Sequence, residues 1–154
     1  MNLYRMALQG NYVLTLGVTA WALAQILKTM LAWIMGKKFK AERLIGSGGM
    51  PSSHSALVCS VLIAVWRYEG IHSTMFALAL ILAAIVMYDA MGVRRETGNQ
   101  AKILNKLLVE WLDESDPEGN NKQLKELVGH TPFEVIGGAV LGVVLALVIG
   151  PVSG

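Results

Sequence analysis

Long apolar segments constrain the fold of this chain more than any other feature. They cover residues 11–35, 52–66, 74–91 and 133–149. The first segment alone exceeds the roughly 20 residues that cross a bilayer. Only 16% of the 154 residues are charged and 54% are hydrophobic, whereas a soluble domain has about 25% charged residues. The pattern predicts an all-α integral membrane protein, a single domain over 1–154 built as a four-helix bundle.

The segment between the third and fourth apolar runs, residues 92–130, is of a different kind. Over 97–111, apolar side chains recur at helical spacing, while charged side chains such as Lys102 and Lys106 fall on another face. This pattern predicts an amphipathic helix, which we expect to lie along the membrane interface.

Basic residues gather on one side of the predicted bundle. With four spans, the loops 36–49 and 92–129 share a side and hold ten Lys and Arg, against Arg5 and Arg67 on the other side. The positive-inside rule therefore places both loops in the cytoplasm. The net charge of +2 is too small to indicate a nucleic-acid partner.

A glycine-rich loop leads into the second apolar segment with the sequence Gly48-Gly49-Met50-Pro51-Ser52-Ser53-His54-Ser55. Glycines such as Gly49 permit backbone shapes that other residues rarely adopt. Ser52 and Ser53 can cap the following helix, and a helix start favours a phosphate group. His54 follows with an imidazole that gives or takes a proton near neutral pH. The plain alternative is a turn and helix start with an interfacial histidine.

The fourth apolar segment opens in a similar way, with Gly129-His130-Thr131-Pro132-Phe133-Glu134. His130 and Glu134 are four residues apart and are therefore neighbours on one helical face. A carboxylate beside an imidazole fixes its tautomer and raises its basicity. Four spans bring this pair to the same membrane face as His54. Two histidines near cations indicate phosphoryl transfer, with His130 as the nucleophile and His54 as the acid.

Lys28 lies well inside the first apolar segment, three residues after Gln25 and on the same helical face. A lysine at this depth is costly unless it faces a polar interior. The alternative is that its long side chain extends to the nearby interface. We therefore treat Lys28 as a candidate phosphate-binding residue with a structural alternative.

Three arginines are further candidates for binding phosphate, since the planar fork of arginine suits this group. Arg43 is the basic-loop residue closest to the glycine-rich stretch, and Arg94 and Arg95 follow Asp89 at the end of the third apolar segment. Asp89 could hold an arginine in position or form a structural ion pair. A zinc site fits poorly, because the surrounding arginines would oppose a cation.

The two motifs resemble those of a known superfamily. Pro51-Ser52-Ser53-His54 resembles the Pro-Ser-Gly-His motif of the type 2 phosphatidic acid phosphatases, which share a superfamily with the vanadium haloperoxidases. His130-x-x-x-Glu134 resembles the final His-x-x-x-Asp of that superfamily. The whole chain is most similar to the small divergent PAP2 membrane proteins, through residues 48–56, 88–95, 100–101, 104–105 and 129–132.

The resemblance implies a lipid phosphatase of the bacterial cell membrane, and the positive-inside rule places its active site at the cytoplasmic face. It makes His130 the phosphohistidine nucleophile, Glu134 its orienting acid and His54 the general acid, with Ser53 helping to hold phosphate. Phosphatidylglycerophosphate is the substrate that the resemblance suggests, while phosphatidate and polyprenyl diphosphate remain open. The alternative is a non-enzymatic membrane protein that binds anionic lipid through the same cations.

The chain departs from the superfamily pattern in places. The first motif, Lys-x6-Arg-Pro, is absent, and Lys28 and Arg43 are candidates to replace it. The resemblance implies no metal or other cofactor, but Asp89 has no counterpart in the pattern, which leaves a Mg²⁺ site open. Gly138 and Gly142 form a Gly-x-x-x-Gly pattern that permits a homodimer.

Overall fold

The computed structural model describes residues 10–34, 49–112 and 130–150, and all regular structure within these residues is helical. Its helices are α2 (Tyr12–Ile34), α3 (Ser53–Glu69), α4 (Thr74–Met91), α5 (Val93–Leu112) and α6 (Pro132–Val148). Each apolar segment of the sequence forms one helix, with bounds close to those expected. The all-α class is confirmed for the described part of the chain.

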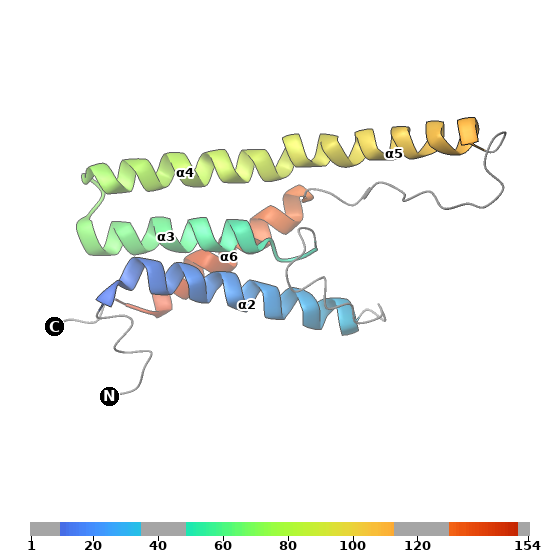
Figure 1. Ribbon diagram of the computed structural model, residues 1–154. Helices are drawn as coiled ribbons and strands as arrows, with labels where there is room; N and C mark the ends of the chain where they lie inside the picture. Colours follow the sequence, from blue (N-terminus) through green and yellow to red (C-terminus); the bar gives the residue numbers. More distant parts are fainter. Residues whose placement is uncertain (1–9, 35–48, 113–129, 151–154) are drawn as a thin grey trace.

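Helix α3 is the central element of the bundle. It packs against α2, α4 and α6, and α6 also contacts α2 (Figure 1). Helix α6 approaches α3 so closely that only glycine fits at two positions. A Cβ at Gly138 would collide with the carbonyl oxygen of Ser52, and one at Gly142 with that of Ala56. The Gly-x-x-x-Gly pattern is thus used inside the protein, and it gives no support for a homodimer.

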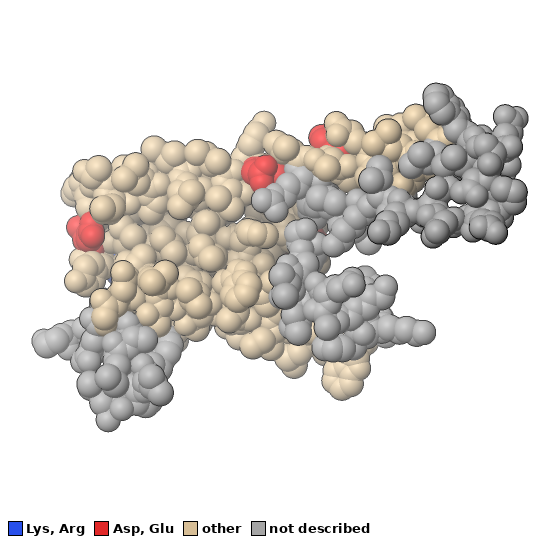
Figure 2. Space-filling model, viewed as in Figure 1, with Lys and Arg blue, Asp and Glu red and all other residues tan. Residues whose placement is uncertain are grey.

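The surface of the bundle suits a lipid environment. Helix α4 buries small residues, among them Ala79 and Ala83, and exposes large apolar ones such as Ile81 and Ile85. In Figure 2 the surface over α2, α3 and α4 is almost free of charged side chains, and the acidic residues in view lie toward its edges.

Two stretches are long and apolar enough to cross a membrane, Tyr12–Ile34 and Thr74–Leu107, the second of which joins α4 to most of α5. Helices α3 and α6 have 17 residues each, which is at the lower limit for a span. That the chain crosses the membrane four times therefore stays a prediction.

Helix α5 continues the line of α4 beyond the end of the bundle (Figure 1). The expected amphipathic helix over 97–111 begins earlier, because Gly92 does not end the hydrogen-bond ladder. The Gly92 N–H donates to the carbonyl of Tyr88 at 2.8 Å, and the Gly92 carbonyl accepts from the N–H of Glu96 at 3.0 Å. Among the described helices α5 packs only on α4, and its interfacial position stays a prediction.

Arg67 and Tyr12 bind backbone carbonyls at the end of the bundle where α6 terminates. The guanidinium of Arg67 donates from Nη1 to the carbonyls of Ala146 at 2.6 Å and Leu147 at 3.0 Å, and Tyr12 Oη donates to the carbonyl of Ile149 at 2.7 Å. The last carbonyls of a helix have no partner within it, and a cation there is favourable. Arg67 and Tyr12 therefore supply partners for carbonyls at the end of α6 and join that end to α3 and α2.

Replacing Gly142 with alanine tests the close packing of α6 on α3. The added Cβ would also lie 3.0 Å from the backbone nitrogen of Ser60, and backbone cannot move aside cheaply. We expect Gly142→Ala to lower the free energy of unfolding by about 1–3 kcal/mol, measured by thermal unfolding in detergent.

Gly137→Ala is the matched control on the same helix. Its Cβ would lie 3.2 Å from the flexible end of Met50 and in ordinary contact with Met50 Cγ at 3.8 Å and Pro51 Cβ at 4.0 Å. We therefore expect no loss, or a gain of up to about 1 kcal/mol from helix propensity. Equal destabilisation by the two substitutions would contradict the packing described here.

Candidate active site

The glycine-rich loop enters α3 in a conformation that glycine makes accessible. Gly49 has a φ of +91°, which favours glycine over residues with a side chain. A Cβ at this position would also lie 3.2 Å from Cγ and Cδ of Lys28. Ser52 then caps α3, since its Oγ accepts a hydrogen bond from the N–H of Ser55 at 3.3 Å. Ser52 and Ser53 are both buried.

The start of α6 is a capping box that contains one of the candidate site residues. The Glu134 carboxylate accepts from the backbone N–H of Thr131 at 3.0 Å, and the Thr131 Oγ1 accepts from the N–H of Glu134 at 3.4 Å. Spacing alone predicted the pairing of Glu134 with His130 and missed its role in the cap. The Thr-x-x-Glu pattern just before the apolar run was the signal.

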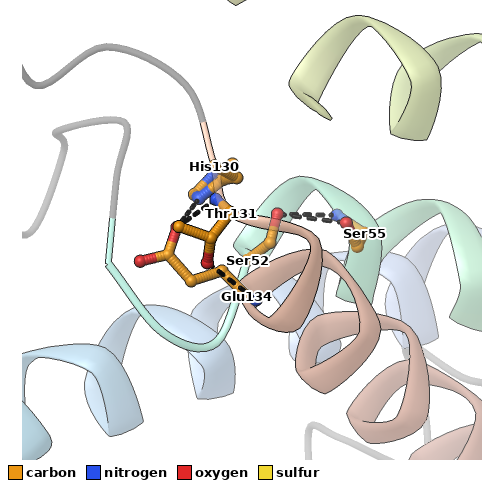
Figure 3. Close-up of polar contacts among 5 residues, drawn as sticks. All are labelled: Ser52, Ser55, His130, Thr131 and Glu134. Carbon is orange, nitrogen blue, oxygen red and sulfur yellow. Dashed lines mark hydrogen bonds and ion pairs between the residues drawn. The ribbon is translucent and has the colours of Figure 1, made fainter. Parts of the chain in front are cut away.

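The same carboxylate oxygen orients the ring of His130. Glu134 Oε2 lies 3.1 Å from His130 Nδ1 (Figure 3). With the proton on Nδ1 facing the carboxylate, the other ring nitrogen, Nε2, carries the lone pair. His130 is 3% exposed, and its Nε2 has no hydrogen-bond partner within the described residues. A buried polar atom without a partner is costly, so this nitrogen is a candidate for function.

Backbone contacts join the two motifs. The N–H of Ser52 donates to the carbonyl of Glu134 at 2.9 Å, which ties the start of α3 to the start of α6. The N–H of His130 donates to the carbonyl of Ala90 at 3.0 Å, near the end of α4. The rings of His54 and His130 lie in a T-shaped, edge-to-face arrangement, with their centroids 6.2 Å apart and their planes at 62°. The structure therefore brings the two histidines together.

Helix α2 contributes a buried cation to the same end of the bundle. Lys28 is 5% exposed, its side chain packs against Gly49, and its charge interacts favourably with the Glu134 carboxylate. Its burial does not agree with a side chain that extends to the interface. A lysine buried in a membrane protein needs an opposite charge or a polar interior, and the end of the bundle supplies both.

The remaining candidates are less well placed by the structure. Arg43 lies outside the described residues. Arg94 and Arg95 belong to the first turn of α5, close in sequence to Ala90, but only their backbone is described. Asp89 is half-buried at the end of α4 and has a contact of its own. The described residues contain no group of three or more His, Cys, Asp or Glu that could hold a metal ion.

The fold and site define a helical membrane protein with two neighbouring histidines at one end of its bundle. One of them, His130, lies against a carboxylate. The chain belongs to the divergent PAP2 family, whose model matches residues 9–145. It is 37% identical over 153 residues to the "uncharacterized membrane protein YuiD" of Bacillus subtilis (strain 168), which covers 94% of this chain and 97% of the relative. No solved structure matches the chain significantly. The family resemblance seen in the motifs is confirmed.

Two substitutions at Glu134 separate its role in the cap from its charge. Glutamine at this position also completes a capping box, whereas both substitutions remove the charge that interacts with Lys28, so we expect Glu134→Gln to unfold at a higher temperature than Glu134→Ala. Glu134→Ala removes the side-chain acceptor and should lower the free energy of unfolding by about 1 kcal/mol. Thermal unfolding in detergent measures both, and a loss for Glu134→Gln as large as that for Glu134→Ala would contradict the capping role.

Proposed function

We propose that this protein is a membrane lipid phosphatase that hydrolyses a phosphomonoester of a lipid head group through a phosphohistidine. The orientation of His130 carries the proposal. Its Nδ1 lies 3.1 Å from the Glu134 carboxylate, and its Nε2 is buried without a described partner beside His54. Membership of the divergent PAP2 family supports a phosphatase-related role.

In the proposed first step, the lone pair of His130 Nε2 attacks phosphorus and forms a P–N bond while the ester P–O bond breaks. The leaving oxygen takes a proton from the His54 imidazolium, so the lipid departs as an alcohol. In the second step, neutral His54 accepts a proton from water, whose oxygen attacks phosphorus. The P–N bond then breaks, which releases phosphate and regenerates the neutral His130 imidazole and the His54 imidazolium. The Glu134 carboxylate stabilises the positive charge on the His130 ring during the attack.

The transferred phosphoryl group carries negative charge, so its stabilisation is mostly electrostatic. Lys28 is a buried cation that contacts Gly49 and is attracted to Glu134, the residue that lies against His130. Ser52 and Ser53 stand at the start of α3, where N–H groups and the helix dipole favour an anion. We assign Lys28 as the functional substitute for the absent first-motif lysine. Arg43, Arg94 and Arg95 remain proposed phosphate-binding residues.

The surroundings of the site favour a lipid substrate. Phe133 is 79% exposed and directly precedes Glu134, and the exposed side chain of Met50 lies across Gly137 one turn further along α6. Apolar side chains next to an ionic site suit a head group whose tails remain in the bilayer. We propose phosphatidylglycerophosphate at the cytoplasmic face of the cell membrane, with phosphatidate and polyprenyl diphosphate as alternative substrates.

Phosphate release from purified protein in detergent tests the proposal. The substrates are phosphatidylglycerophosphate, phosphatidate and undecaprenyl diphosphate, each with EDTA or with magnesium. We expect the wild type to release phosphate from at least one lipid in EDTA, and His130→Ala to lose about 10³-fold or more. His72→Ala is the matched control, because His72 is exposed in the turn between α3 and α4 and should retain full activity.

Other outcomes of this assay would change the conclusion. A strict requirement for magnesium would bring Asp89 into the reaction and contradict the metal-free mechanism. Absence of release from all three lipids by folded protein, with retained binding to anionic vesicles, would favour the lipid-binding alternative.

Glu134→Gln supplies a second test of the mechanism. The variant keeps the helix cap and loses the charge that stabilises the His130 imidazolium. We expect its kcat to fall by about 10²–10⁴-fold with little change in KM. Full activity in Glu134→Gln would show that the carboxylate does not support the nucleophile.

A further inference from the structure

Gln25 has a buried acceptor whose role the proposed reaction leaves open. Its side chain is 6% exposed, and its Oε1 has no hydrogen-bond partner in the part of the chain that the structure describes. Leaving a buried carbonyl oxygen without a donor is unfavourable. Such an atom in a native protein calls for an explanation, such as a ligand that supplies the donor.

The packing of α2 on α3 places Gln25 at the level of the phosphate-binding serines. The two helices run in opposite directions: Gly17 lies against Val61 and Leu57, Ala20 and Ala24 pack in one cluster with Ala56, and Lys28 contacts Gly49. Gln25 falls between Ala24 and Lys28 in this register. It therefore lies at the height of Ser52 and Ser53, at the end of α3 where α6 also begins.

Gln25 and Lys28 share a helical face because they are three residues apart. Lys28 is suited to the negative charge of a phosphate, whereas the carbonyl oxygen of Gln25 is not. An acceptor can contact a phosphate favourably only through a proton on one of the phosphate oxygens. Phosphomonoesters keep such a proton in part near neutral pH, since their second pKa is about 6. Phosphodiesters and sulfate carry none at that pH.

We propose that Gln25 is a specificity-determining residue whose Oε1 accepts a hydrogen bond from a protonated phosphate oxygen. The inference rests on the proposed phosphatase function. It gives a physical reason why the substrate is a phosphomonoester or a terminal phosphate, since these groups can carry a proton. It also supplies a reason for rejecting phosphodiester head groups, which surround the protein in the bilayer. A deprotonated oxyanion would bring its lone pairs against those of Oε1.

Calorimetric titration of detergent-solubilised protein with sodium phosphate and sodium sulfate at pH 7 tests the inference. We expect the wild type to bind phosphate about ten- to a hundredfold more tightly than sulfate, from one charge-assisted hydrogen bond. Gln25→Met keeps the length of the side chain and removes the acceptor, so the two affinities should become nearly equal. Gln25→Glu restores an acceptor oxygen and should restore the preference for phosphate, with weaker binding of both ions.

Thr19→Val is the matched control, because Thr19 lies on the same helix and its Oγ1 donates to the backbone carbonyl of Thr15 one turn earlier. It should keep the wild-type ratio of affinities. Equal affinity for the two ions in the wild type, or an unchanged ratio in Gln25→Met, would overturn the inference even when lipid phosphate release succeeds. If Gln25→Met weakened the binding of phosphate and sulfate equally, Gln25 would be a donor to the anion, and this result would also overturn the inference. Binding of neither ion, together with no lipid hydrolysis, would contradict the proposed function as well.

Discussion

The candidate site depends on the contacts of one residue, Glu134. Its carboxylate accepts from the backbone N–H of Thr131 at the start of α6 and lies 3.1 Å from His130 Nδ1, while its carbonyl accepts from the N–H of Ser52 at the start of α3. Glu134 thereby joins the beginnings of two helices and orients the ring of His130. Since the first N–H groups of a helix lack partners within it, the same polar contacts stabilise the fold and shape the site.

Burying this polar cluster in an apolar bundle requires close helix packing around α3. Gly138 and Gly142 let the backbone of α6 approach that of α3, and Gly49 leaves room for the side chain of Lys28. At each of these positions a side chain would block the close approach of the neighbouring backbone or side chain. The result is a buried histidine held in a fixed orientation, with the buried cation of Lys28 at the same end of the bundle.

Much of this arrangement could be predicted from the sequence, because local spacing carries it. The apolar runs set the helices within a few residues, and the four-residue spacing of His130 and Glu134 predicted their contact. The use of Gly138 and Gly142 within the chain was not predictable, because a Gly-x-x-x-Gly pattern does not identify the helix it packs on. The early start of α5 was missed, since Gly92 reads as a helix end although its hydrogen bonds continue. The sequence places Gln25 on one helical face with Lys28 inside an apolar segment, but the burial of its acceptor and the lack of a described donor depend on tertiary packing.

The most direct test of the central claim is to trap the covalent intermediate. Protein is incubated with lipid substrate radiolabelled in its terminal phosphate, quenched in alkaline detergent and analysed for protein-bound label. The account predicts acid-labile, alkali-stable label on His130 in the wild type and none in His130→Ala. Phosphate release by the wild type without any protein-bound label, or label that persists in His130→Ala, would contradict a phosphohistidine at this position.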